Sequence, residues 1–302
     1  MSPLTDSGDA RAVSTVLDVA VCLLFVTAAV GVLTTADRPV PEDSNSADRA
    51  ASLLGTTTAT VHYGTSGGGG TAPERATAAC RPATGETRPD GCRTAHGTVA
   101  DLLARAAVAD VADNESTGPS QFEQGVRNAT RHRLAGIPAA WQVVVTWRAY
   151  PNAPLGGRVT VGDDPPPGID VHTATLRVPV AEGTPRARAD GDAGTVGAVA
   201  RRAASATVTR LFPPEPTRLA LVAGSPADQR TAGRYRRTAA TLGVGLDGAV
   251  GDGSVRRAND FLVEALAARY AGDLNTRTDE PADAAALVSV ETATVTVRTW
   301  SA

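Results

Sequence analysis

The stretch Trp141–Tyr150, WQVVVTWRAY, is the clearest strand signal in the chain. Valine, tryptophan and tyrosine suit a pleated, half-buried surface, so this composition predicts a β-strand. Arg158–Gly162 and Ile169–Val180 follow it as further expected strands, after turns rich in proline, glycine and aspartate. Strands in direct succession with turns between them predict an antiparallel meander.

Further elements are expected on both sides of this group. Apolar residues at helical spacing predict helices at His96–Ala112, Thr195–Phe212 and Val255–Ala271. Two further helices, both rich in arginine, are expected at Gln121–Leu134 and Ala227–Leu242. Ser254 is the expected N-cap of the last helix, and Gly272 its expected end. β-prone stretches at Thr56–Tyr63 and Leu287–Trp300 predict two more strands. Together these elements predict an α+β fold, with packed helices and an antiparallel sheet.

A long apolar run, Ala12–Ala36, precedes all of these elements and contains one charge, Asp18. A helix needs about 20 apolar residues to span a bilayer, so this run predicts a transmembrane helix. Pro39 and Pro41 then end the helix, because proline lacks the N–H donor that a helix requires. The N-terminus has three open interpretations, which are a secretory signal peptide cut near Ala36, an uncleaved anchor and a pilin-type leader.

The residues Arg11–Asp18, RAVSTVLD, carry a family resemblance. They resemble the leader junction of archaeal type IV pilins, in which a basic residue and a small residue precede the cut and an apolar helix follows it. The resemblance implies cleavage between Ala12 and Val13 and a helix-pairing role for Asp18. The alternative for Asp18 is a carboxylate that reaches the headgroups or is protonated. The segments expected are a cytoplasmic leader, a transmembrane helix, a linker and an extracellular α+β domain, at 1–12, 13–36, 37–51 and 52–302.

Composition adds to this picture. The net charge is −3 and all 29 basic residues are arginine. The slightly acidic balance argues against a nucleic-acid partner. A chain that is rich in alanine, threonine, aspartate and glycine and lacks lysine resembles the envelope proteins of salt-loving archaea.

Cys80 and Cys92 bracket a polar, turn-rich loop, CRPATGETRPDGC. Such a pair outside the cytosol predicts a disulfide, and two free thiols are the alternative. Asn114 and Asn128 each begin a glycosylation-type sequon and are candidate modification sites. Both features favour an extracellular position for the long C-terminal part.

Motifs that could carry chemistry are weak. Ser66 stands in a G-x-S-x-G pattern, but a glycine run follows it and favours a flexible loop. The G-x-G-x-x-G at Gly243–Gly248 lies between expected helices, whereas a dinucleotide site needs a preceding strand. Asp163 and Asp164 fit a solvated turn better than a cation site. The histidines show no metal-ligand spacing, at His62, His96, His132 and His172. We therefore predict no catalytic, cofactor-binding or metal-binding residues.

The favoured function is a non-enzymatic, single-pass membrane protein with the bulk of its chain outside the cell. The resemblance implies a pilin-like minor subunit or accessory of a type IV pilus or a related secretion system. Its expected partners are membrane lipid, other pilin-like helices and the pilus assembly machinery. One alternative is a tethered cell-surface domain that binds a ligand and keeps its anchor. The other is a membrane-bound hydrolase that uses Ser66.

Overall fold

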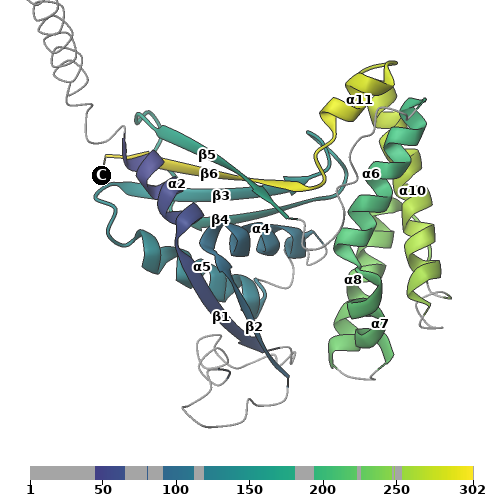
Figure 1. Ribbon diagram of the computed structural model, residues 1–302, viewed down its shortest axis with the longest axis horizontal. Coiled ribbons are helices and arrows are strands. Elements are labelled where there is room, and N and C mark those ends of the chain that lie inside the picture. The colour runs from purple at the N-terminus through teal and green to yellow at the C-terminus, as the bar shows by residue number, and fades with distance from the viewer. Residues whose placement is uncertain are drawn as a thin grey trace, which may run out of the picture. The chain divides into compact units, whose positions relative to one another are not determined.

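The computed structural model describes residues 45–64, 80, 91–111, 119–180, 194–222, 226–246, 248 and 254–301. The chain divides into two compact units, Met1–Asn45 and Ser46–Ala302, and every element named below belongs to the second. This unit has the expected mixed α+β fold (Figure 1). Its described elements are α2 (Ser46–Thr56), β1 (Thr58–Gly64), β2 (Cys92–Thr98), α4 (Val99–Asp110), α5 (Gln121–Leu134), β3 (Ala140–Arg148), β4 (Gly156–Gly162), β5 (His172–Pro179), α6 (Val196–Leu211), α7 (Pro214–Val222), α8 (Pro226–Leu242), α10 (Val255–Asn275), α11 (Pro281–Leu287) and β6 (Thr292–Trp300).

A four-stranded antiparallel sheet with the order β4-β3-β6-β5 forms the centre of this unit. Side chains alternate between its faces, and one face is lined by buried valines. Val143 of β3 lies opposite Val161 of β4 and Val297 of β6. β-branched side chains pack well on a pleated surface, which is why this valine-rich sequence forms the core.

The predicted meander is correct for β3 and β4 and wrong for β5. β5 pairs with β6, the C-terminal strand, and β6 lies between β3 and β5. Strand order depends on contacts between segments far apart in the chain, so local pattern could not supply it. The consequence is that the end of the chain is fixed inside the sheet.

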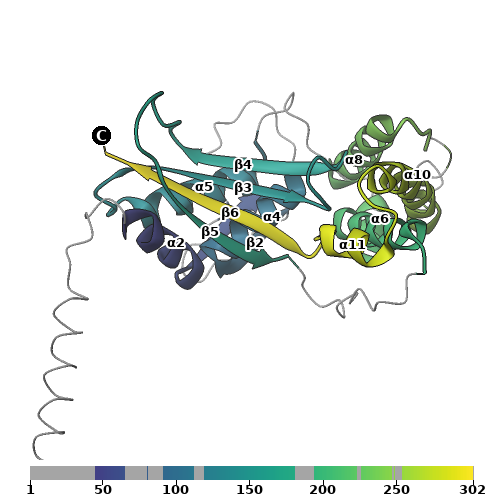
Figure 2. The same ribbon diagram turned by 90° about the horizontal axis from the view of Figure 1, so that it is seen from above.

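Two helices, α2 and α4, cover the valine-lined face of the sheet (Figures 1 and 2). α4 lies so close to β4 that a Cβ atom at Gly157 would overlap the carbonyl oxygen of Ala107. Glycine is therefore needed at this position. α2 begins at Ser46, inside the linker predicted at 37–51, because its alanine and leucine side chains are buried in the core. The folded head thus starts earlier than the predicted boundary at residue 52.

β1 and β2 form a separate two-stranded hairpin. β2 was missing from the sequence prediction, which instead places His96 in a helix. Its sequence, CRTAHGT, is polar, and pairing with β1 is what makes it a strand. The helix begins only at Val99, where Thr98 and Asp101 form a capping box. The hairpin packs on α5 so closely that a Cβ atom at Gly125 would overlap Cγ1 of Val61.

Helices α6, α7, α8 and α10 pack together in a bundle, and α6 runs alongside α10 (Figure 1). Phe212 stacks on Tyr235 with 3.9 Å between ring centroids. Asn259 joins both segments, because its Oδ1 accepts from the Tyr235 hydroxyl at 2.7 Å and its Nδ2 donates to the Phe212 carbonyl at 3.0 Å. These contacts hold the turn after α6 against α8 and α10.

The bundle differs from the sequence prediction at several helix ends. α7 and α11 were not predicted, and each begins at a proline, Pro214 and Pro281 respectively. Proline is compatible with the first turn of a helix, where its missing N–H is not needed. α10 continues past Gly272 to Asn275 because Tyr270 and Leu274 are buried on its inner side. Ser254 precedes α10 as expected, but its side chain makes no capping hydrogen bond.

A group of aromatic and polar contacts joins the sheet to the bundle. Trp147 of β3 donates from Nε1 to the carbonyl oxygen of Val290 at 2.8 Å. Just beyond β3, the ring of Tyr150 meets that of Tyr270 edge-on, with centroids 4.9 Å apart. The Tyr150 hydroxyl donates to Asp273 at 2.9 Å. The two Tyr150 contacts fix the segment just after β3 against α10.

Within the described part of the chain, no helix combines the length and the apolar character needed to cross a membrane. The run Ala12–Ala36, on which the membrane prediction rests, lies outside the described residues.

Candidate interaction surface

The second face of the four-stranded sheet is polar. Seen from above, the four strands lie over α2, α4 and α5, and no described helix covers the strands on this side (Figure 2). Threonine and arginine dominate the face, because they alternate with the buried valines along each strand. We call this set of side chains the open face; its polar members are Gln142, Thr146, Arg148, Arg158, Thr160, Thr173, Thr175, Arg177, Thr292, Thr294, Thr296 and Arg298.

The strand register arranges these side chains in rows. Thr146 lies opposite Arg158 on one side and Thr294 on the other, and Thr294 lies opposite Arg177. This row therefore has two threonines in the middle and an exposed arginine at each end. The next row runs from Thr160 through a buried valine to two more threonines.

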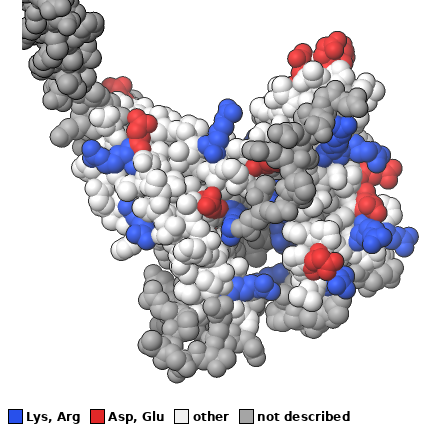
Figure 3. Space-filling view, viewed as in Figure 1, with Lys and Arg blue, Asp and Glu red and all other residues white. Residues whose placement is uncertain are grey.

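Charge is balanced at one end of the open face. Arg298 donates from Nη1 to Oε1 of Gln142 at 3.3 Å, and Nε2 of Gln142 donates to Oδ1 of Asp164. The row with Arg158 and Arg177 is four residues further along each strand, and it forms the more basic end of the open face. Figure 3, which views the molecule from the side, shows acidic and basic side chains interspersed over the sheet and the bundle.

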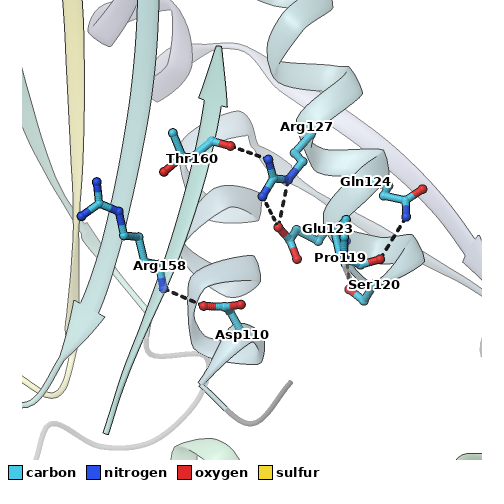
Figure 4. A network of polar contacts seen from close by, with 8 residues as sticks. All are labelled: Asp110, Pro119, Ser120, Glu123, Gln124, Arg127, Arg158 and Thr160. Atoms are coloured by element: carbon cyan, nitrogen blue, oxygen red, sulfur yellow. Dashed lines mark hydrogen bonds and ion pairs between the residues drawn. The ribbon is translucent and has the colours of Figure 1, made fainter. Parts of the chain in front are cut away.

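Hydrogen bonds from two helices occupy the outer edge of β4 (Figure 4). Arg127 of α5 donates from Nη1 to the carbonyl oxygen of Thr160, and its guanidinium is paired with Glu123 at 2.6 Å. Asp110 of α4 accepts from the backbone N–H of Arg158 at 2.8 Å. The Arg158 side chain points away from Asp110, across β4 and toward the open face (Figure 4). The edge contacts therefore hold β4 in the position that presents Arg158 on the open face.

The side chains of the open face can bind a ligand through hydrogen bonds and charge. Threonine hydroxyls both donate and accept hydrogen bonds, and arginine offers a planar array of donors that matches carboxylate, sulfate or phosphate. A sheet that carries both kinds of group suits an extended ligand with hydroxyls and negative charges. Among the described residues, no group of three or more histidine, cysteine, aspartate or glutamate side chains is arranged to hold a metal ion.

The predicted site residues fall in different places. Arg11, Ala12, Val13, Asp18, Ser66 and Asn114 lie outside the described residues. Cys80 and Cys92 are joined in a disulfide, with their Cα atoms 5.4 Å apart, at the start of β2. Asn128 is exposed on α5, where its Oδ1 accepts a hydrogen bond from Arg131 at 3.4 Å.

The weak motifs also have clear positions. Gly243 follows α8 with a φ of 72°, and the backbone N–H of Val244 returns to the carbonyl of Ala239 at 3.0 Å. Glycine here closes the C-terminal end of a helix, and no strand precedes it. Of the four histidines, His132 lies on α5 and His172 on β5, whereas His62 and His96 share one face of the β1–β2 hairpin.

Sequence reasoning missed the open face as a functional candidate. The signal was present in the C-terminal strand, where Thr292, Thr294, Thr296 and Arg298 alternate with alanine and valine. That alternation indicates one buried and one polar face. It could not show that arginines of β4 and β5 join the same rows, because the order of the strands was unknown.

Comparison with known proteins gives one match. Residues 17–300 match the model of a family described as a family of unknown function, DUF7284. No curated protein and no solved structure matches the chain. The match includes most of the apolar run and nearly all of the head, and the chain is therefore a member of the DUF7284 family.

Proposed function

We propose that this protein is a non-enzymatic, membrane-anchored extracellular protein that acts as a pilin-like minor subunit or accessory of a type IV pilus or a related secretion system. The N-terminal helix would pack beside other apolar helices in the membrane or filament. The α+β head would be displayed outside the cell.

The apolar run at 13–36, placed directly before a disulfide-bonded head, is the observation that carries this proposal. The run is long enough to span a bilayer. Disulfides persist in oxidising surroundings, which favours an extracellular head. The family match begins at Leu17, inside the run, so the apolar segment and the head belong to the same family region.

The test is the mature N-terminus of the full chain, purified from membranes of an archaeal host and read by intact mass and terminal peptide sequencing. We expect the chain to begin at Val13. Ala12→Leu should block this cut, because a bulky residue replaces the small one before it. Ala36→Leu is the matched control, since it would block only a signal-peptidase cut after Ala36.

Each other outcome contradicts the pilin-like assignment. A chain that begins at Asp37 would be a secreted protein without an anchor. A chain that keeps its leader, or loses only Met1, would be a plain tethered domain.

The open face favours this tethered domain as the second candidate function. In that case the head would bind an anionic, hydroxyl-rich polymer, such as an acidic polysaccharide, through the row that ends in Arg158 and Arg177. The double variant Arg158→Ala/Arg177→Ala should then weaken retention on an acidic polysaccharide column. A control that removes two exposed arginines of the bundle, Arg201→Ala/Arg269→Ala, should leave retention unchanged. Equal retention of both variants would exclude the open face as the binding surface.

A further inference from the structure

The outer face of the β1–β2 hairpin carries two adjacent histidine–threonine pairs. In the strand register, His96 lies opposite Thr60 and His62 lies opposite Thr94. Each pair is hydrogen-bonded across the strands, with 2.9 Å between Nδ1 of His96 and Oγ1 of Thr60 and 3.1 Å between Nδ1 of His62 and Oγ1 of Thr94. The sequence alone gave no hint of this pairing, because β2 was not recognised as a strand.

These hydrogen bonds leave the same nitrogen available on both rings. When Nδ1 carries the proton and donates it to threonine, the lone pair of a neutral imidazole is on Nε2. Histidines that bind metals commonly use their second ring nitrogen in this way, to fix the tautomer and the orientation of the ring. Thr60 and Thr94 therefore prepare His96 and His62, respectively, to act as Nε2 ligands.

The two histidines are diagonal neighbours on one face of the hairpin. Such positions are about 7–8 Å apart across an antiparallel pair, within reach of long or aromatic side chains. Two imidazoles that turn toward one another can therefore meet at one ion. Both side chains are accessible to solvent, with His96 exposed and His62 partly exposed.

The hairpin also has a firm backing. Its opposite face packs on α5 through Val61, which is buried. The Cys80–Cys92 disulfide adds a covalent restraint beside the end of the strand pair where Gly64 lies opposite Cys92. Ligands held on a rigid element lose less conformational freedom on binding, which raises affinity.

We propose that His62 and His96 form a surface site for one divalent first-row transition-metal ion, Cu²⁺, Ni²⁺ or Zn²⁺, with water completing the coordination. Imidazole nitrogen suits these ions, whereas Mg²⁺ and Ca²⁺ require oxygen ligands. Among the described residues, no third histidine, cysteine or carboxylate completes a larger cluster. The site thus keeps open coordination positions and binds with modest affinity.

The experiment titrates the untagged, full-length protein in detergent with Ni²⁺ at pH 7.5, using isothermal calorimetry. The wild type should bind one Ni²⁺ ion. In His62→Gln and in His96→Gln, the affinity for this ion should fall at least tenfold. His132→Gln and His172→Gln are matched controls that should bind as the wild type does. All four variants should keep the wild-type circular dichroism spectrum, since none of these side chains is buried.

Three further readouts separate a shared site from independent histidines. The double variant His62→Gln/His96→Gln should bind no more weakly than either single variant, because both residues act on the same ion. Thr60→Val and Thr94→Val should each lower the affinity for Ni²⁺ by about tenfold, since they remove only the hydrogen bond that orients the imidazole. With Cu²⁺ as the probe, electron paramagnetic resonance should show two coordinated imidazole nitrogens.

The proposal is overturned if either His62→Gln or His96→Gln binds Ni²⁺ like the wild type. It is equally overturned if His132→Gln or His172→Gln removes the same binding event, or if Ca²⁺ competes with Ni²⁺ for it. None of these results depends on where the mature chain begins, so the site stands or falls independently of the anchor.

Discussion

At the scale of single residues, the tyrosines carry much of the specific packing. Of the four tyrosines, Tyr150, Tyr235 and Tyr270 are almost completely buried. The hydroxyl of each has a hydrogen-bond partner, and a buried hydroxyl without one would carry a desolvation cost. Burial raises the pKa of all three, and the hydrogen bond to Asp273 raises that of Tyr150 further.

These shifts predict how stability changes at high pH. Burial raises the pKa of Tyr270 to about 12, from 10.0 in the unfolded chain. Protonated Tyr270 makes its full contribution to the free energy of unfolding below about pH 10. That contribution is lost as the pH rises from about 10 through about 12. We expect the free energy of unfolding, measured by urea denaturation, to fall over this range while tyrosinate absorbance remains low in the folded state.

Tyr270→Phe is the control for this prediction. It keeps the buried ring, removes one titrating group and should make the fall in stability shallower. A native protein whose buried tyrosines ionise near pH 10 without unfolding would contradict the assignment.

At the scale of elements, close helix–strand approaches set the geometry of the sheet. α4 lies against β4 at Gly157, where any side chain would collide with the Ala107 carbonyl oxygen. The backbone hydrogen bonds at the β4 edge come from the same two helices, α4 and α5. A displacement of α4 should therefore disturb the edge of the sheet as well.

Gly157→Ala tests this approach. The added methyl must push α4 away from β4, and overpacking of a core costs about 1–3 kcal/mol or more. Gly136→Ala is the matched control, since no atom lies within 4 Å of the position its Cβ would take. In thermal unfolding the first variant should melt well below the wild type and the second should not. Equal melting temperatures would show that α4 does not pack as described.

Arg127→Ala tests the role of the β4 edge. The change removes the donor to the Thr160 carbonyl and leaves Glu123, which is 7% exposed, without its partner. Loss of such a partner costs about 1–3 kcal/mol. Backbone groups of an edge strand that have lost their hydrogen-bond partners can also pair with a strand of another chain. We expect lower stability and more concentration-dependent association in light scattering than for the wild type.

Gln124→Ala is the control for the edge, because the Gln124 side chain donates to the Pro119 carbonyl at an exposed position and not to β4. If Arg127→Ala scatters like Gln124→Ala at every concentration, Arg127 does not protect the edge.

At the scale of the whole molecule, the disulfide connects stability to location. Cys80 and Cys92 close a loop with a sequence separation of 12. A link of this size stabilises by about 2–4 kcal/mol, chiefly by restricting the unfolded chain. The head should therefore be most stable in an oxidising compartment.

The double variant Cys80→Ser/Cys92→Ser should lower the free energy of unfolding by about 2–4 kcal/mol in urea denaturation. Cys22→Ser, in the apolar run, should leave the unfolding of the head unchanged. Protein taken directly from cells should show Cys80 and Cys92 resistant to thiol labelling until a reductant is added. Rapid labelling of both residues without reductant would place the head in a reducing compartment.

The α+β class, most of the helices and strands, and the cysteine pair could all be predicted from the amino-acid sequence. A strong local signal accounts for part of this success, namely the valine-rich stretch of β3. The expected arginine-rich helix at Gln121–Leu134 also has the same bounds as α5. The apolar run and the resemblance to a pilin leader also come from the amino-acid sequence, and the proposed location and function rest on them.

The order of the strands, the existence of β2 and the two candidate surfaces could be known only from the folded chain. The polar segment of β2 becomes a strand because β1 supplies hydrogen-bond partners, and this brings His62 beside His96. Likewise, β6 enters between β3 and β5 and places Arg158 and Arg177 at the two ends of one row. Local propensity is a property of neighbouring residues, whereas these arrangements arise from contacts between segments far apart in the chain, and for that reason no local pattern could reveal them.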